Sequence, residues 1–203
     1  MLTSPAFCQF SLDLCQENVE DGLTTFNGGD GVTIPETLGG RECRVLDTDN
    51  NSYHLYVRIQ DANYEPPSIV YVTIWYYDRS GRVFLNYDAG AEEPYKVAPE
   101  IYFQEGSNSW KQMHFTLVNP AFDRRENGQS DFRIVCMDPL AIDQVILSEI
   151  PPDGFLSPDA YFSDKSPITP PTGMTCIQQW QVHGSVSASV LSDGAYQTAR
   201  KIG

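Results

Sequence analysis

Apolar residues recur at every second position from about residue 53 to residue 147, and this alternation constrains the fold more than any other feature of the sequence. In the segment YHLYVRIQ (53–60), one set of alternate residues is apolar: Tyr53, Leu55, Val57 and Ile59. The intervening set includes His54, Arg58 and Gln60. Because successive side chains point to opposite faces of a β-strand, the pattern predicts a half-buried antiparallel strand.

The same alternation recurs in three later segments, RVFLNYD (82–88), KQMHFTL (111–117) and LAIDQVIL (140–147). Turn-forming residues separate such segments, in DRSG (78–81), EGSN (105–108) and ENG (126–128). Short strands in this number, with no convincing helix between them, predict an all-β fold, an antiparallel β-sandwich of the jelly-roll type.

The composition changes after residue 150, where prolines become too frequent for the interior of a sheet. We therefore expect a sandwich domain at 1–150, a Pro-rich linker at 151–173 and a further segment at 174–203. The last residues, VLSDGAYQTARKIG, predict a short C-terminal helix, because Ser192 or Asp193 suits its N-cap and Gly203 its end.

Charge and hydropathy narrow the set of partners. The chain has 13 Lys and Arg against 27 Asp and Glu, a net charge of −14, which repels phosphate backbones and anionic membranes. No run approaches the roughly 18 apolar residues of a membrane span. We therefore expect a soluble protein that binds neither nucleic acid nor membrane. The first ten residues, MLTSPAFCQF, have neither the basic start nor the apolar stretch of a signal peptide.

The cysteines and histidines indicate no catalytic or metal motif. The five cysteines form no CxxC pair: Cys8, Cys15, Cys43, Cys136 and Cys176. Buried free thiols are the favoured interpretation, and a Cys8–Cys15 disulfide is the alternative. The three histidines are scattered along the chain: His54, His114 and His183. The HExxH, GxSxG, P-loop and GxGxxG signatures of common catalytic sites are missing from the sequence.

Several motifs between about Glu20 and Leu147 follow one another in a familiar order. EDGLT, GGDGVT, VYVTIWYYD, FDRRENGQSDFRI and LAIDQVIL resemble the jelly-roll modules appended to bacterial glycoside hydrolases. The resemblance implies a non-catalytic, galactose-binding-like β-sandwich that holds an enzyme near its polysaccharide. It also implies a location outside the cell or at its surface and, in many such modules, a structural calcium ion.

The C-terminal segment is similar to something else. GMTCIQQWQVHGSVSASVLSDGAYQTARKIG looks like the opening of a glycoside hydrolase (β/α)8 barrel, which would make 174–203 the start of a second, catalytic-barrel-like domain. A complete barrel needs about 250 residues, so a piece of this length does not catalyse. We therefore expect that the chain as it stands is not an enzyme.

Candidate sugar-binding rings lie near the turns that a sandwich presents at its ends. Tyr64, Tyr95 and Trp110 are such rings, and a ring can pack on the C–H-rich face of a sugar while polar neighbours bond its hydroxyls. The alternative for each is a loop ring that covers the core.

Two polar candidates, Arg125 and Asn127, match the family's pattern in FDRRENGQSDFRI, and the resemblance implies that they donate to sugar hydroxyls. The favoured interpretation of the stretch itself is a hairpin turn at Asn127 and Gly128, with Arg125 paired to Asp131.

The segment IVYVTIWYYD (69–78) carries bulky residues on both of its faces. Its alternation puts Val70, Val72, Ile74 and Tyr76 on one face and Tyr71, Thr73, Trp75 and Tyr77 on the other. Such a strand is predicted to be central and covered on both sides. For Trp75 this favours packing in the core or between sheets over stacking on a sugar.

Calcium needs several oxygen ligands gathered by loops. The turns VEDG and GGDG supply Glu20, Asp21 and Asp30 as candidate ligands for a structural Ca²⁺. The alternative is ordinary turn-capping carboxylates.

Three hypotheses for function follow. The first is a carbohydrate-binding module whose partners are a polysaccharide or oligosaccharide and an adjacent glycoside hydrolase catalytic domain. The second is a structural interdomain sandwich with no sugar site of its own. The third and least favoured is that the chain itself is a hydrolase or lyase.

Overall fold

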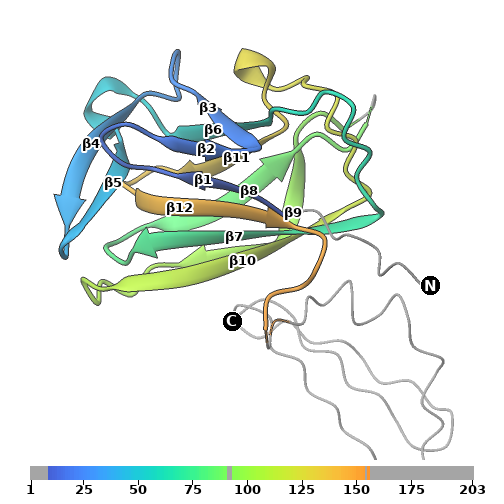
Figure 1. Ribbon diagram of the computed structural model, residues 1–203. Coiled ribbons are helices and arrows are strands. Elements are labelled where there is room, and N and C mark those ends of the chain that lie inside the picture. The colour runs from blue at the N-terminus through green and yellow to red at the C-terminus, as the bar shows by residue number, and fades with distance from the viewer. Residues whose placement is uncertain (1–8, 91–92, 154, 156–203) are drawn as a thin grey trace, which may run out of the picture. The chain divides into compact units, whose positions relative to one another are not determined.

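The structure is a computed structural model that describes residues 9–90, 93–153 and 155. These residues form two antiparallel sheets packed face to face (Figure 1). The seven-stranded sheet has the order β10 (Trp110–Val118), β7 (Ile69–Tyr77), β12 (Ala141–Ser148), β1 (Gln9–Asp13), β2 (Val19–Asp21), and the hairpin of β4 (Thr33–Leu38) and β5 (Arg41–Leu46) joins it through β12. The five-stranded sheet has the order β3 (Leu23–Phe26), β6 (His54–Ile59), β11 (Phe132–Cys136), β8 (Arg82–Tyr87), β9 (Lys96–Phe103).

Two short 3₁₀ turns, η1 (Thr48–Asn50) and η2 (Asn127–Gln129), are the helical elements among the described residues. The predicted all-β antiparallel sandwich is therefore confirmed for this part of the chain. None of the described residues builds a helix with the length and apolarity needed to cross a membrane.

The core lies between the two sheets and contains one set of alternate residues from each strand. In β6 these are Leu55, Val57 and Ile59, each at most 2% exposed. They lie across from inward-facing residues of β7 such as Val72, which is fully buried. Each fully buried side chain of this size stabilises the fold by about 1.5–3 kcal/mol. The two-residue alternation seen in the sequence is thus the pattern that builds the core.

Strand β7 is central, paired with β10 on one side and β12 on the other, as its sequence predicts. Its inward residues are Val70, Val72, Ile74 and Tyr76, and all are buried. Its outward residues include Trp75, which is only partly buried and lies on the outer face of the seven-stranded sheet. The expectation that Trp75 packs in the core or between sheets is therefore wrong, because Tyr76 takes the inward position next to it.

The tip of the β4–β5 hairpin folds onto this outer face. Trp110 Nε1 donates to the Leu38 carbonyl at 3.0 Å, and a small apolar cluster around Cys43 forms beneath the hairpin. Gly39 has φ +53°, and a Cβ at this position would lie 3.1 Å from Trp110 Nε1 and 3.2 Å from the Tyr77 ring. A glycine here therefore allows the tip to sit directly against two rings.

Two fully or nearly fully buried carboxylates fix the loop between β10 and β11. Asp88 accepts from the Arg125 guanidinium and from the backbone N–H of Asp123 at 3.0 Å. Asp131 instead accepts from the backbone N–H of Ile59 at 2.8 Å and of Arg124 at 3.2 Å. The predicted pairing of Arg125 with Asp131 is wrong, because Asp131 is used entirely as a backbone cap.

The predicted turn at Asn127 and Gly128 is present as η2, where Gly128 has φ +67°. It is not a hairpin turn, because β11 pairs with β6 and β8 rather than with the preceding strand β10. Of the predicted linker, residues 151–153 and 155 are described and form neither helix nor strand. The rest of the linker and the predicted segment at 174–203, with its helix, lie outside the described residues.

Among the described cysteines, Cys15, Cys43 and Cys136 are free thiols, and the last two are buried, as the favoured interpretation predicted. Cys8 and Cys176 lie outside the described residues, but because Cys15 is a free thiol, the alternative of a Cys8–Cys15 disulfide is wrong.

Candidate functional site

The outer face of the seven-stranded sheet carries an indole between two amides. In the register of β10, β7 and β12, Trp75 lies directly opposite Gln112 on one side and Gln144 on the other. Gln112 is exposed, and Trp75 and Gln144 are partly exposed. Directly opposed residues on one face of a sheet have their Cβ atoms about 5 Å apart, so both amides lie within reach of a group resting on the indole.

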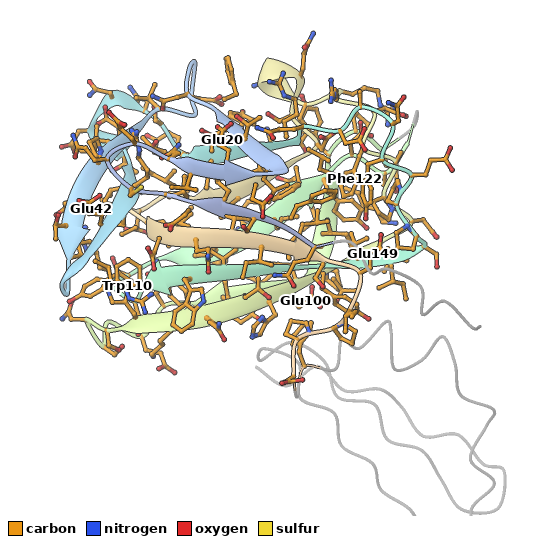
Figure 2. All side chains as sticks on the ribbon, in the orientation of Figure 1. Glu20, Glu42, Glu100, Trp110, Phe122 and Glu149 are labelled. Carbon is orange, nitrogen blue, oxygen red and sulfur yellow. The ribbon has the colours of Figure 1, made fainter. Side chains whose placement is uncertain are left out.

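A second row of rings continues this surface toward the β4–β5 hairpin. Trp110 lies opposite Tyr77, and the two rings meet edge to face with centroids 5.3 Å apart. The Trp110 hydrogen bond to the Leu38 carbonyl fixes its orientation. Figure 2 labels Trp110 at the hairpin end of this sheet.

The hairpin also places a guanidinium over the rings. Arg41, the first residue of β5, has its guanidinium carbon 5.0 Å from the Trp75 ring centroid and 5.7 Å from that of Trp110. A 2.6 Å ion pair with Asp143 holds it there, and Asp143 lies where the register of β12 and β7 shifts. Such cation–π contacts contribute about 0.5–1 kcal/mol each at exposed sites.

We call this set of residues the Trp75 face: Arg41, Trp75, Trp110, Gln112, Asp143 and Gln144. It presents partly exposed rings for apolar contact, two amides that donate and accept, one guanidinium that donates and one carboxylate that accepts. Asp13 lies beside it, opposite Gln144, and burial and then the Asp143 charge raise the Asp13 pKa above its usual value.

The far end of the same outer face is closed by packing. The Thr73 hydroxyl lies 3.0 Å from His114 Nδ1, and burial lowers the pKa of His114 below its usual value. The Phe155 ring lies against His114, with centroids 5.2 Å apart, and against Tyr71, with centroids 6.5 Å apart. His114 is therefore a partly buried residue held by packing on Phe155 and by its contact with Thr73.

The five residues predicted to bind sugar do not converge. Trp110 belongs to the Trp75 face. Tyr64 packs edge to face on Phe10 with centroids 5.1 Å apart and donates to Glu149 Oε1 at 3.2 Å, so it covers the core. Arg125 is bound to the buried Asp88 and fixes a loop.

The other two predicted residues lie in connections next to the opposite, five-stranded sheet: Tyr95 in the turn before β9 and Asn127 in η2, before β11. Tyr95 is 40% exposed and belongs to a shallow pocket formed by residues 93–97. The Arg133 guanidinium carbon lies 4.5 Å from the Tyr95 ring centroid. Asn127 donates from Nδ2 to the Tyr56 hydroxyl at 3.0 Å.

The three carboxylates predicted to bind calcium are not gathered around one point. Glu20 Oε2 accepts from Gln60 at 2.8 Å, whereas Asp30 Oδ1 accepts from the Tyr56 hydroxyl at 2.8 Å. Asp21 lies in the exposed strand β2. Over residues 9–90 and 93–153, no three His, Cys, Asp or Glu side chains are grouped to hold a metal ion. These residues do not fit a shared site, and a structural calcium ion stays a prediction without ligands.

Sequence reasoning missed Arg41, Gln112 and Gln144. The alternation of β7 already put Trp75 and Tyr77 on a common face. What it could not give is the order β10, β7, β12, which joins segments far apart in the chain and brings the two glutamines to the indole. The local sequence signal near Arg41 is the turn LGGR (38–41), which indicates a β-hairpin. The sequence does not show which surface this hairpin contacts.

Comparisons with known proteins add little. No protein-family model and no curated protein matches the sequence. Among solved structures, the chain is similar to CBM29_1, a family 29 carbohydrate-binding module from Piromyces equi, with 15% sequence identity and a TM-score of 0.44, over 74% of this chain and 96% of that one. Neither the fold nor the site described above depends on that similarity.

Proposed function

We propose that the chain is a non-catalytic, galactose-binding-like carbohydrate-binding module that binds a glycan across the Trp75 face. In this proposal it holds an attached glycoside hydrolase at its polysaccharide, outside the cell or at its surface. One observation carries the proposal: Trp75 lies partly exposed on a central strand, directly between Gln112 and Gln144.

The row of Gln112, Trp75 and Gln144 has the chemical groups needed to bind a sugar ring. A pyranose has an apolar C–H face that can rest on an indole, and equatorial hydroxyls at its rim that both donate and accept hydrogen bonds. An amide has the same dual character, so one glutamine on each side of the indole can serve hydroxyls on opposite edges of the ring. Arg41 and Asp143 add a donor and an acceptor at the hairpin end.

The support beneath the row is rigid. Trp75 stands on a strand paired along both edges, with fully buried Val72 and Ile74 on the reverse side. A platform built on a paired central strand needs no ordering when the ligand binds, so less of the binding free energy is lost to conformational entropy.

Affinity electrophoresis in gels that contain soluble neutral polysaccharides tests the proposal. We expect at least one polysaccharide to retard the protein, and Trp75→Ala to weaken that binding by about 2 kcal/mol, or roughly 30-fold. Gln112→Ala and Gln144→Ala should each cost about 1 kcal/mol, or roughly fivefold.

Tyr53→Ala is the matched control, because Tyr53 is a partly exposed ring whose hydroxyl bonds Asn51, away from this face. It should migrate like the parent protein at every polysaccharide concentration. Retardation that persists unchanged in Trp75→Ala would remove the Trp75 face as the site, and no retardation by any glycan would remove the function.

A second candidate function is a structural interdomain sandwich. The packing of Phe155 on Tyr71 and His114 favours it, since the chain that follows β12 already rests on the outer face of the same sheet. Under this function, Trp75→Ala lowers the melting temperature of the intact protein by several degrees while glycan retardation is absent from the start.

A further inference from the structure

Two arginines on the five-stranded sheet, Arg58 and Arg82, form no ion pair within the part of the chain that the structure describes. Among the Lys and Arg side chains of the described residues, Arg58 and Arg82 alone make neither an ion pair nor a hydrogen bond to another described residue. This is unexpected in a chain with 27 Asp and Glu and a net charge of −14. In so acidic a protein, arginines without an ion pair indicate a surface that can bind an anion from outside the chain.

Both arginines lie on the outer face of this sheet, with Arg133 between them. Arg58 belongs to β6, Arg133 to β11 and Arg82 to β8, three strands that lie side by side in Figure 1. In the register, Arg133 lies opposite Tyr56 on one side and Asn86 on the other.

Arg58 is two residues from Tyr56, and Arg82 is four residues from Asn86 in the opposite direction along the sheet. With about 3.4 Å per residue along a strand and about 4.8 Å between strands, the Cα atoms of Arg58 and Arg133 are about 8 Å apart and those of Arg133 and Arg82 about 14 Å apart. We call this line of Arg58, Arg133 and Arg82 the arginine diagonal.

Rings accompany two of the three cations. The Arg133 guanidinium lies over Tyr95, which is 40% exposed at the shallow pocket of residues 93–97. The Arg82 guanidinium carbon lies 5.4 Å from the Phe84 ring centroid, and Phe103, 62% exposed, lies opposite Arg82. The surface therefore repeats a pairing of positive charge with an aromatic ring.

Two carboxyl groups near the middle of the diagonal, Asp30 and Glu126, do not neutralise it. Asp30 is bound by the Tyr56 hydroxyl and lies 3.2 Å from His54 Nδ1. Arg133 Nε donates to Asn86 Oδ1 at 3.2 Å, and the carboxyl nearest to it is Glu126, with Oε2 3.8 Å from Nε and a fully buried side chain. Neither of its oxygens has a hydrogen-bond partner among the described residues. Burial raises the pKa of Glu126 to about 8, so this carboxyl carries a proton near neutral pH.

We propose that the arginine diagonal is a second binding surface, on the opposite sheet from the Trp75 face, for a polysaccharide whose sugars carry acidic groups. The acidic groups are carboxylates or sulfates, whose shared chemistry is an anion that accepts from a guanidinium. The rings beside Arg133 and Arg82 contact the sugar faces between successive charges. Only the choice of a polysaccharide as the polymer rests on the function proposed above.

Nucleic acid is the less suitable anion. Duplex DNA carries one charge per about 1.7 Å, and a protein of net charge −14 repels a polymer of such high charge density more strongly than one with sparser charges. An acidic polysaccharide carries its charges farther apart, which suits arginines whose Cα atoms are about 8 and 14 Å apart better.

Affinity electrophoresis of the intact protein tests the inference, with polygalacturonate and chondroitin sulfate as acidic probes, a neutral galactan, and single-stranded DNA. We expect retardation by at least one acidic polysaccharide that falls when salt is raised, because exposed charge pairs are screened. The double variant Arg58→Gln, Arg82→Gln should weaken it about four- to twenty-fivefold, which is about two- to fivefold for each exposed charge. Comparing the two acidic probes tells which anion is preferred.

Arg79→Gln is the matched control, because it removes one positive charge at the other sheet, where Arg79 pairs with Glu36. It should leave acidic binding nearly unchanged, and Trp75→Ala should do the same. The inference is overturned if neither acidic polysaccharide retards the protein, if Arg79→Gln matters as much as the double variant, or if DNA is held equally well. Loss of neutral binding in Trp75→Ala is a separate outcome that bears on the proposed function alone.

Discussion

At the scale of single residues, Glu126 is a buried carboxyl whose charged form the described sandwich strongly disfavours. Both carboxyl oxygens lack a hydrogen-bond partner among the described residues, and the nearest cation is Arg133 at 3.8 Å. Burial is the main reason that its pKa is raised from 4.5 to about 8, while the Arg133 charge acts in the opposite direction. The folded state therefore prefers this carboxyl protonated.

The sign of the pH effect follows. Between about pH 4.5 and 8 the folded protein retains a proton on Glu126 that the unfolded chain has released, so this group destabilises the fold progressively as the pH rises. Glu126→Gln should match the parent protein near pH 4 and be more stable by about 3–5 kcal/mol at pH 9. Urea unfolding at a series of pH values measures the difference.

Glu17→Gln serves as the control, since Glu17 is exposed and lies in a loop before β2. Its stability should follow that of the parent protein at every pH. A Glu126→Gln variant that gains nothing above pH 8 would show that the carboxyl finds a partner in solution.

At the scale of elements, the β4–β5 hairpin supplies part of the Trp75 face and contacts its rings. It supplies Arg41, and its tip meets Trp110 and Tyr77 through Gly39. Yet it joins the sheet through only two residue pairs of β5 with β12. The position of the hairpin, and with it the guanidinium, therefore depends on the packing of its tip.

Two adjacent glycines allow a matched test of that packing. Gly39 and Gly40 both have positive φ, at +53° and +80°, but a Cβ at Gly39 would crowd Trp110 and Tyr77, whereas one at Gly40 meets nothing within 4 Å. Gly40→Ala should cost about 1 kcal/mol from backbone strain alone. Gly39→Ala should cost about 1–2 kcal/mol more and shift the tryptophan fluorescence, because the tip moves off the rings.

Thermal unfolding and emission spectra of the two variants check this. Equal melting temperatures and equal spectra for Gly39→Ala and Gly40→Ala would mean that the tip does not rest on Trp110. A fall in neutral glycan binding for Gly39→Ala, with Gly40→Ala unchanged, would tie the hairpin to the Trp75 face.

How much of each element the sequence predicts depends on how local its cause is. The strand alternation is local, so Leu55, Val57 and Val72 could be assigned to the core from the sequence. The partner of a buried carboxylate is not local. Because Arg125 and Asp131 are close in the sequence, an ion pair between them was predicted. In the fold, Asp131 instead accepts from the backbone N–H of Ile59, and Arg125 donates to Asp88.

The same distinction between local and non-local causes explains why the burial of Trp75 and the role of Tyr64 were predicted wrongly. A bulky residue on each face of β7 predicted cover on both sides, but cover depends on what the neighbouring elements place there. Phe155 covers Tyr71, whereas the contact recorded over Trp75 within residues 9–90, 93–153 and 155 is that of the Arg41 guanidinium. Tyr64 lies in a loop and was a reasonable ligand candidate, but its ring closes the core against Phe10.

At the scale of the whole molecule, the reactivity of the two buried thiols can be used to measure how readily two different parts of the structure open. Cys136 belongs to the large core between the sheets, and Cys43 to the small cluster beneath the hairpin. Burial raises the pKa of both thiols to about 11, so neither reacts while the fold is closed.

We expect Cys15, which is partly exposed, to be alkylated first, Cys43 next and Cys136 last. The order follows because the hairpin can open without separating the sheets, whereas Cys136 requires global unfolding. Mass spectrometry of peptides after timed alkylation measures the three rates. Equal rates for Cys43 and Cys136 would show that the hairpin and the sheets open as one unit.

The apolar layer between the sheets has a geometric consequence. It places the outward side chains of β7 and those of β11 on opposite sides of the same molecule, pointing away from each other. A polymer strand lying against one side leaves the other side open to a different strand. If the Trp75 face and the arginine diagonal bind as proposed, one protein joins a neutral and an acidic polymer, and we expect a measurable rise in the viscosity of a mixture of the two.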